Sequence, residues 1–416
     1  MVNLKKCLLG ELVAVTRGAS LSGNYYSTKG EYIRLTCGNF DYRNNCFKEN
    51  TSKDNLFYTG VFKAEFLLEK GDIITPLTEQ AIGLLGTTAR IPESGKYIQS
   101  QDIALIKCKA DRIDSTFCYY LISSRLVRDQ LSAAAQQTKI RHTSPDKIKD
   151  CIVWVPKLDE QRAIGRLLAS LDDKIQLNKR INDNLEAMAK QLYDYWFVQF
   201  DFPNEDGKPY KSSGGAMVWN EKLKRMIPQG WNNGILSDVA NITMGQSPDG
   251  SSYNELGEGS IFYQGSTDFG LRFPSIRQYT TSPNRCANKG DILMSVRAPV
   301  GALNIANNDC CIGRGLSALS SKIGSITHLY YLMNDFRLKF EGMNSAGTTF
   351  GSITKDELFN LPVVIPTKSV ISEFEKVCEP IFDKQMIIGE EINVLTKQRD
   401  ELLPLLMNGQ ASINSD

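Results

Sequence analysis

Few residues of this 416-residue chain have the types and spacing that catalysis needs. The carboxylates and lysine of a nuclease, which hold a metal ion and polarise a phosphate, come together only superficially, at Asp146 and at Asp172-Asp173-Lys174. Because Asp172 to Lys174 falls within a heptad pattern, we expect a charged, exposed helix face instead. The two histidines, His142 and His328, are far apart in the sequence, so neither a histidine-based metal site nor a hydrolase triad is expected. The sequence therefore predicts no catalytic residues and no metal site.

Motifs for nucleotide and methyl-group chemistry are missing as well. The chain has no G-x-x-x-x-G-K-[ST] phosphate loop and no Asn/Asp-Pro-Pro-aromatic loop of an adenine methyltransferase. Gly313-Arg314-Gly315 and Gly342 are predicted to be turn glycines. The ten cysteines form no C-x-x-C, the first residues do not resemble a signal peptide, and no run approaches the ~18 apolar residues of a membrane helix. We therefore expect reduced thiols and a cytoplasmic location.

The chain repeats itself. Three pairs of blocks share their pattern of apolar, acidic and small residues, and they occur in the same order in both halves. The pairs are Leu9 to Ser20 with Leu236 to Ser247, Gly71 to Ile74 with Gly290 to Leu293, and Ser144 to Pro156 with Thr354 to Pro366. Three matches in register, each offset by about half the chain, indicate a tandem duplication.

Each half ends in a heptad pattern. The residues spaced by seven are Ile164, Leu171, Asn178, Leu185 and Leu192 in the first half, and Phe374, Ile381, Ile388, Leu395 and Leu402 in the second. A second stripe is formed by Leu168, Ile175 and Met188, and by Ile371, Cys378, Ile392 and Leu406. These patterns predict two coiled-coil helices, the first about 50 Å long. Asn178 is expected either to pair within the seam or to face solvent, and Pro380 to mark a kink or a late helix start.

The globular parts are predicted to mix α and β structure. Residues 103–106 and 151–155 are strand-like, whereas Ser115 to Leu131 has helical spacing with a serine as candidate N-cap. The predicted fold class is α/β (α+β), with two tandem α/β domains separated by two long antiparallel coiled-coil helices in a pseudo-twofold internal repeat. Residues 1–157 carry a formal net charge of +6, which permits nucleic acid binding, whereas residues 369–416 carry −5, which favours a protein partner.

On four segments the chain resembles the DNA-specificity subunits of type I restriction–modification systems. The first three segments are Leu158 to Phe202, Gly245 to Gly270, and Gly290 to Leu319. The fourth is Ile365-Pro366 together with the distal helix, which ends in the stretch from Leu402 to Gln410. The resemblance covers essentially the whole chain. The first half departs more from the family pattern, with ITPLTEQAIGLLGTTARIP where the second half has MSVRAPVGALNIA. We therefore expect two different half-sites and an asymmetric target.

The resemblance implies a non-catalytic subunit of an endonuclease and adenine methyltransferase complex. Each half would carry a target recognition domain that reads half of a bipartite site in double-stranded DNA. The two helices would act as a ruler and dock two copies of a methylation subunit, and restriction (helicase–nuclease) subunits would complete the complex. The partners would use S-adenosylmethionine, ATP and Mg²⁺, whereas this chain would hold no cofactor and contact no membrane. A rod of about 50 Å spans roughly 15 base pairs.

This implied organisation divides the chain into six parts. They are target recognition domain 1 (1–157), the central conserved helix (158–200), a linker (201–230), target recognition domain 2 (231–368), the distal conserved helix (369–410) and a tail (411–416). The side chains Tyr195, Trp196 and Phe197, which close the first helix, are expected to pack rather than to stack on bases.

Candidate DNA contacts follow from side-chain type, because Lys and Arg neutralise phosphates while Arg, Lys, Asn, Gln, Ser and Thr read base edges. In the first half they are Arg17, Asn24, Tyr25, Tyr26, Arg34, Asn39, Lys139 and Arg141, with His142 beside them. In the second half they are Gln246, Ser247, Tyr253, Tyr263, Gln264, Arg297, Thr348 and Thr349. Each of them also suits a solvated surface or an internal hydrogen bond, and Arg297 either braces the fold or contacts phosphate.

Three alternatives remain open at this point. The chain would serve only a solitary methyltransferase, it would be a coiled-coil scaffold without DNA binding, or it would be an independent enzyme. The long matched blocks outside the heptads argue against the scaffold, and the missing motifs argue against the enzyme.

Overall fold

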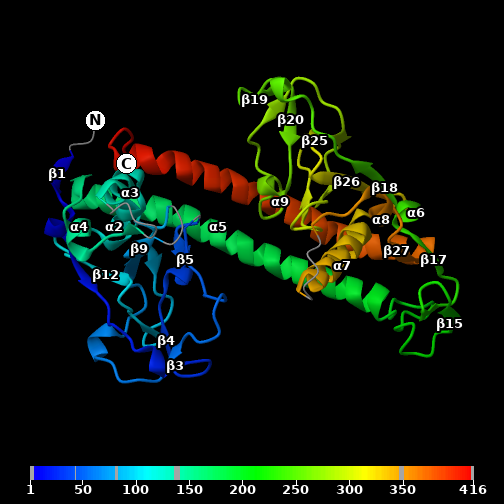
Figure 1. Ribbon diagram of the computed structural model, residues 1–416, viewed down its shortest axis with the longest axis horizontal. Helices are drawn as coiled ribbons and strands as arrows, with labels where there is room; N and C mark the ends of the chain where they lie inside the picture. The colour runs from blue at the N-terminus through cyan, green and yellow to red at the C-terminus, as the bar shows by residue number, and fades with distance from the viewer. Residues whose placement is uncertain (1–3, 43, 80–82, 135–140, 346–350, 414–416) are drawn as a thin grey trace. The chain divides into compact units, whose positions relative to one another are not determined.

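The computed structural model describes residues 4–42, 44–79, 83–134, 141–345 and 351–413 (Figure 1). The chain forms two compact units, one of residues 1–176 with 394–416 and one of residues 177–393. Each unit combines a globular α/β domain with parts of two long helices, α5 (Leu158–Tyr193) and α9 (Lys368–Met407). The predicted fold class is confirmed.

The first globular domain is built around two four-stranded sheets. One has the order β10 (Ala89–Arg90), β8 (Ile73–Pro76), β12 (Ile103–Cys108), β2 (Val13–Arg17), and the other β11 (Tyr97–Ile98), β4 (Tyr32–Arg34), β7 (Phe57–Tyr58), β3 (Tyr26–Ser27). Two-stranded pairs are β1 (Lys5–Leu8) with β14 (Ile152–Val155), β5 (Phe40–Asp41) with β6 (Cys46–Phe47), and β9 (Thr78–Glu79) with β13 (Arg141–His142). The helices are α1 (Leu9–Leu12), α2 (Ser115–Ser123), α3 (Arg125–Ala134) and α4 (Pro145–Lys149).

Strand β12 contains a continuous apolar run because both of its faces are buried. Ala104 and Ile106 enter one hydrophobic core, whereas Ile103 and Leu105 enter another on the opposite face of the sheet. A strand that is buried on both faces does not alternate apolar with polar residues. The prediction of a strand at residues 103–106 is confirmed.

The predicted helix from Ser115 to Leu131 is two helices. Ser124 interrupts it in an extended conformation, between α2 and α3. The N-cap is Asp114 rather than Ser115, because the Asp114 carboxylate accepts hydrogen bonds from the backbone amides of Thr116 and Phe117.

The second globular domain follows the same plan. One sheet has the order β18 (Ala240–Met244), β26 (Leu316–Ser321), β23 (Ile292–Ser295), β24 (Leu303–Ile305). The other has the order β19 (Tyr253–Asn254), β21 (Tyr279–Thr280), β20 (Ser260–Tyr263), β25 (Cys310–Ile312), β22 (Cys286–Ala287). Strand β17 (Asn232–Ile235) pairs with β27 (Pro362–Ile365), and the helices are α6 (Leu236–Val239), α7 (Ile326–Ser345) and α8 (Lys355–Phe359).

The internal repeat extends to single hydrogen bonds. The carboxylate of Glu11 in α1 accepts the amide of Leu8 at 2.9 Å, and that of Asp238 in α6 accepts the amide of Ile235 at 2.9 Å. The turns before β8 and β23 both use a glycine in the left-handed region, with φ of +89° at Gly71 and +94° at Gly290. The repeat read from the sequence is therefore confirmed in the topology of both domains.

Helices α5 and α9 pair antiparallel within each unit (green and orange to red in Figure 1). In the second unit the buried Asn178 donates to Glu391 at 2.9 Å, so it pairs within the seam rather than facing solvent. Pro380 neither delays the start of α9 nor interrupts its assigned range. No described helix is long and apolar enough to cross a membrane.

The second stripe of each helix differs from the prediction. On α5, Met188 is 56% exposed, and the buried positions that continue from Leu168 and Ile175 are Asn182 and Ala189. On α9, the two gaps in the predicted stripe are filled by the buried polar residues Gln385 and Arg399. Met188 was assigned to the stripe because it is apolar. The spacing of seven from Leu168 and Ile175 instead leads to Asn182 and Ala189, which are buried in the seam although one is polar and the other small.

The segment predicted to be a linker folds onto the end of α5. It contains the hairpin β15 (Met217–Asn220) and β16 (Arg225–Pro228), and it ends next to Trp231. Phe202 stacks on Trp231 with ring centroids 5.0 Å apart. Trp196 and Phe197 are buried in the same aromatic cluster, as expected, whereas Tyr195 is 36% exposed.

This aromatic cluster encloses His328, which makes the stability of the second unit depend on pH. Burial lowers the pKa of His328 from 6.5 to about 3, and its ring lies 4.5 Å from that of Phe197. Between pH 6.5 and 3 the unfolded chain binds a proton at this residue and the native chain does not, so stability is lost as the pH falls. We expect a loss of ~2 kcal/mol between pH 6.5 and 5 from this residue.

The measurement is urea unfolding followed by tryptophan fluorescence at several pH values. His328→Phe should remove this part of the pH dependence, and His142→Gln, at an exposed position, is the control. An unchanged pH dependence in His328→Phe would contradict the prediction.

Candidate nucleic-acid interface

A polar cleft of about 490 Å³ lies at one edge of the second globular domain. It is bounded by the end of β20, the end of β23 and the Gly313-Arg314-Gly315 turn that follows β25. Gln264, Arg277, Arg297 and Arg314 are among its lining residues. Two of them, Gln264 and Arg297, are candidate DNA contacts from the sequence.

Two of the three arginines in this cleft are unpaired. Arg277 donates to the buried carboxylate of Asp268, with its Nε 2.7 Å from Oδ1. Arg297 and Arg314 are exposed, and neither forms an ion pair with any residue that the structure describes. The exposed carboxylate of Glu255 also lines the cleft, so its charged side chains leave a formal excess of one positive charge, which suits a phosphate backbone.

Close backbone packing brings further candidates to the cleft. The amide of Arg314 donates to the hydroxyl of Ser247 at 3.3 Å, and the amide of Gln246 donates to the carbonyl of Ile312 at 3.0 Å. A Cβ at Gly245 would lie 2.2 Å from the carbonyl oxygen of Gly313, so only glycine fits there. Gln246, Ser247, Gln264 and Arg297 are thus gathered in one region.

The two tyrosines predicted in this half have other surroundings. Tyr253 stacks on Phe262 with centroids 4.9 Å apart, and its hydroxyl donates to the carbonyl of Pro248 at 3.0 Å. Tyr263 is fully buried, and burial raises the pKa of its hydroxyl. The remaining candidates, Thr348 and Thr349, lie outside the described residues.

The candidates of the first half divide into buried and exposed groups. Arg34 is buried, with its guanidinium 3.7 Å from the ring centre of Tyr26 and a hydrogen bond of 3.2 Å to the carbonyl of Asn55. Asn39 is buried and accepts the amide of Thr36 at 2.9 Å. These contacts brace the domain, so both side chains lie away from any ligand at the surface.

The exposed group is spread over several loops. Arg17, at the end of β2, donates through Nε to the carbonyl of Gln101 at 2.8 Å, whereas Asn24 and Tyr25 lie on the surface. Arg141 lies 3.7 Å from the buried carboxylate of Glu79, beside the exposed His142. Lys139 lies outside the described residues. The structure does not gather these residues into one cleft.

Equivalent positions of the two domains differ at the cleft. Arg297 bridges to Ser352 through the backbone, and in the first domain Thr78 pairs with His142 in the same way. The cleft arginine of one domain thus corresponds to a neutral residue in the other. Arg277 and Arg314 were missed by the sequence analysis, because Arg314 was interpreted only as part of a glycine turn and Arg277 belongs to no motif.

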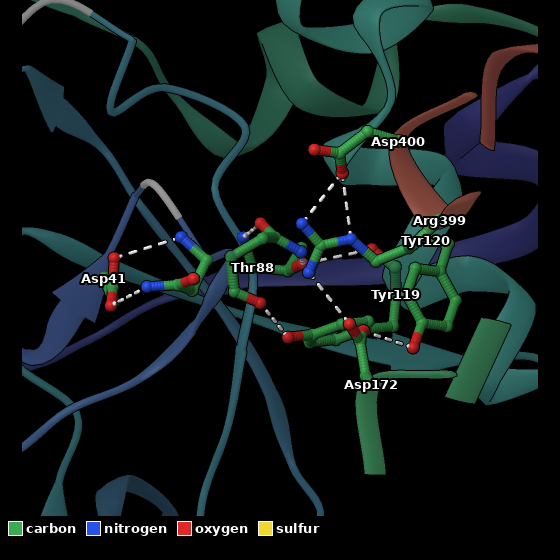
Figure 2. A network of polar contacts seen from close by, with 9 residues as sticks. Asp41, Thr88, Tyr119, Tyr120, Asp172, Arg399 and Asp400 are labelled. Atoms are coloured by element: carbon green, nitrogen blue, oxygen red, sulfur yellow. Dashed lines mark hydrogen bonds and ion pairs between the residues drawn. The ribbon is translucent and has the colours of Figure 1, made fainter. Parts of the chain in front are cut away.

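The residues considered for nuclease chemistry have structural partners. Asp172 accepts a hydrogen bond of 2.7 Å from the Tyr120 hydroxyl and one of 2.9 Å from Arg399, so the prediction of an exposed face is wrong for this residue (Figure 2). Asp146 pairs with Lys149 at 2.6 Å. Within the described ranges no group of three or more His, Cys, Asp or Glu residues is arranged to hold a metal ion.

Comparisons with known proteins agree with this architecture. The family profile of the type I restriction modification DNA specificity domain matches residues 1–187 and 228–395. The putative type I restriction enzyme MjaX specificity subunit of Methanocaldococcus jannaschii is 29% identical over 366 residues, covering 85% of this chain and 81% of that protein. The type I restriction enzyme HindI specificity subunit of Haemophilus influenzae is 21% identical over 382 residues, covering 76% and 81%.

A solved structure shows the same fold. The S subunit of the type I restriction–modification system of M. genitalium superposes with a TM-score of 0.62 at 17% identity, covering 98% of this chain and 96% of that one. The sequence repeat, the duplicated domains, the paired helices and the profile match over both halves lead to one assignment. The chain belongs to the DNA specificity subunits of type I restriction–modification systems, a non-catalytic family.

Proposed function

We propose that the chain reads a bipartite, asymmetric target in double-stranded DNA. Residues 1–157 and 231–368 are the two target recognition domains, helices at 158–200 and 369–410 join them, 201–230 connects the halves, and 411–416 is a tail. The observation that carries the proposal is a repeated fold with different chemistry at the equivalent edge, where Arg297 of one domain replaces Thr78 of the other. Two domains with the same frame and different edge residues suit two different half-sites.

The cleft of the second domain supplies both kinds of DNA contact. In this proposal Arg297 and Arg314 neutralise phosphates, and Gln264 of the cleft lining reads base edges. Gln246 and Ser247, which are hydrogen-bonded to the strand and turn that carry Arg314, read base edges as well. In the first domain the exposed Arg17, Asn24 and Tyr25 take these roles, together with Lys139 and Arg141. Arg34, Asn39 and Tyr263 hold the domains in shape instead.

The paired helices dock the other subunits of the complex. Their seam residues are buried or half-buried, but apolar side chains also point outward. In the second unit Leu177 and Met188 of α5 are 45% and 56% exposed, and Ile387 of α9 is 60% exposed. Such side chains on long helices suit a protein partner.

Two methylation subunits dock there and restriction subunits join them. These partners, not this chain, hold S-adenosylmethionine, ATP and Mg²⁺. Such a complex works on chromosomal DNA in the cytoplasm.

The target is found by single-molecule methylation profiling of DNA from a host that expresses this chain with its methylation partner. We expect an interrupted, asymmetric motif with two methylated adenines about one helical turn apart, because two domains of different chemistry read one duplex. A continuous palindrome would contradict the proposal. No methylation by an assembled complex would favour a scaffold, and the absence of a helicase–nuclease gene beside the gene for this chain would favour service to a solitary methyltransferase.

The cleft is tested by replacing both of its unpaired arginines. Arg297→Ala with Arg314→Ala should lower the affinity of the methylation complex for its target and reduce the slope of log K against log salt by about 1.8, since each neutralised phosphate contributes roughly 0.9. The measurement is a salt titration of DNA binding by fluorescence anisotropy.

The matched control is Arg285→Ala, which removes an exposed arginine of the same domain outside the cleft. A salt slope that is unchanged in the double variant, or equally reduced in the control, would show that the cleft is not where the phosphates bind.

A further inference from the structure

Both globular domains contain the same tyrosine pair. The sequence T-x-x-Y-Y-L occurs at Thr116 to Leu121 in α2 and at Thr327 to Leu332 in α7. The ring centroids of Tyr119 and Tyr120 are 5.1 Å apart at an interplanar angle of 87°, and those of Tyr330 and Tyr331 are 5.3 Å apart at 88°. The duplication has thus kept the pair together with its edge-to-face geometry.

In the first unit the second tyrosine of the pair contacts α5. The Tyr120 hydroxyl donates to Oδ2 of Asp172 at 2.7 Å, while Arg399 of α9 donates to Oδ1 of the same carboxylate at 2.9 Å (Figure 2). Arg399 also bonds the Asp400 carboxylate through Nε at 2.9 Å. Burial and the neighbouring Asp172 raise the pKa of Tyr120, so its hydroxyl stays protonated and remains a donor.

In the second unit the arrangement recurs on the same helix. The Tyr331 hydroxyl donates to Oε2 of Glu186 at 3.3 Å, and Gln385 of α9 donates to that oxygen at 2.9 Å. Arg272 adds a third donor at 3.1 Å, and its guanidinium packs against the rings of Tyr330 and Phe382. Each unit therefore joins its domain, α5 and α9 at one carboxylate of α5.

The two joints occupy related places on the helices. Asp172 and Glu186 of α5 are two heptads apart, and so are Gln385 and Arg399 of α9. Gln385 and Arg399 are also the two polar residues of the buried α9 stripe. Buried polar groups of this kind add less to stability than to the choice of one arrangement among several.

A third polar contact of the seam lacks a domain tyrosine. Asn178 of α5 donates to Glu391 of α9, which joins the two helices with each other. Because this contact pairs the helices without holding a domain, its removal can be compared with removal of the tyrosine contacts.

We propose that Tyr120 and Tyr331 are positioning residues that fix the orientation of each recognition domain on α5 and thereby the register of its half-site. The orientation is a statement about each unit alone, whereas its effect on the half-sites rests on the proposed function. In the first unit the hydroxyl is the acting group, because it is the donor that reaches from the domain to the helix carboxylate. In the second unit Arg272 of the domain donates to Glu186 together with the Tyr331 hydroxyl.

In the first unit, further hydrogen bonds connect the tyrosine pair with the hairpin of β5 and β6. The carbonyl of Tyr119 accepts a hydrogen bond from the Thr88 hydroxyl at 3.0 Å, and the Thr88 amide donates to the side chain of Asn45 at 2.8 Å (Figure 2). Asn45, which lies between β5 and β6, has a φ of +50° that these bonds hold in place. The backbone next to Tyr120 is therefore hydrogen-bonded, through Thr88, to this hairpin.

Orientation is measured without DNA in the full chain. Nitroxide-bearing unnatural amino acids are placed at Thr16 on β2 and at Gln176 on α5, both exposed in the first unit, because ten native cysteines preclude thiol labelling. We expect pulsed electron resonance to give one narrow distance distribution in the otherwise unmodified chain and a shifted or broader one in Tyr120→Phe. Asp172→Asn, which keeps the size of the side chain, should act in the same direction.

Asn178→Ala is the matched control, since it removes one hydrogen bond between the helices and none to the first domain. An unchanged distribution in Tyr120→Phe, or equal broadening in Asn178→Ala, would overturn the inference whatever the chain binds.

The effect on DNA is measured with the methylation complex and its profiled target. We compare affinity for the native spacer with affinity for spacers one base pair longer or shorter. The double variant Tyr120→Phe with Tyr331→Phe should lower this discrimination about tenfold, or ~1.4 kcal/mol, and lower affinity for the native target by less. A purely structural role would weaken all spacers equally and would contradict the proposal.

The two measurements keep the two hypotheses apart. If the unmodified complex binds no interrupted target, the proposed function fails and the distance measurement still decides the orientation. If the unmodified complex discriminates between spacers and the double variant does so equally well, the positioning role of the tyrosines is wrong and the proposed function stands.

Discussion

The pairing of α5 with α9 is the constraint on which the rest of the structure depends. A seam of only leucine and isoleucine would tolerate a slip of seven residues, because apolar side chains accept one another in many registers. Here polar contacts between the helices interrupt the seam, among them Asp172 with Arg399, Asn178 with Glu391, and Glu186 with Gln385. A pairing slipped by seven residues would bury these polar groups without hydrogen-bond partners. The free energy lost in that way favours the observed antiparallel register.

The duplication shows which features the fold itself requires. Both domains keep the carboxylate that caps the first short helix, the left-handed glycine before the central strand and the tyrosine pair. Each of these serves the backbone or the joint with α5. The edge residues Thr78 and Arg297 serve neither, and there the two copies have diverged. The features shared by the two domains thus identify the residues that maintain the fold, and the positions that differ identify residues of the exposed edge.

The sequence predicted the features that depend on periodicity and failed where a distant partner decides. The repeat, the heptads and the strand at residues 103–106 follow from spacing alone. Gln385 and Arg399 were left out of the seam because polar residues are expected outside, and their partners Glu186 and Asp172 lie on another helix. Arg34 and Asn39 were candidate DNA contacts, with an internal hydrogen bond as one alternative, because neither their burial nor the carbonyl and amide groups that satisfy them are visible in the sequence.

The same reasoning explains why net charge is a poor guide to where this chain binds. The first domain carries the larger positive charge, yet the guanidinium of Arg34 lies over Tyr26 and donates to the carbonyl of Asn55, and that of Arg90 donates to the Thr116 hydroxyl. An arginine that already satisfies a buried group would have to leave it unsatisfied in order to reach a phosphate, which opposes binding. Arg297 and Arg314 form no ion pair with any described residue, although their domain is nearly neutral. A binding surface in this fold is therefore identified by the cations that folding leaves unpaired rather than by the number of cations that a domain contains.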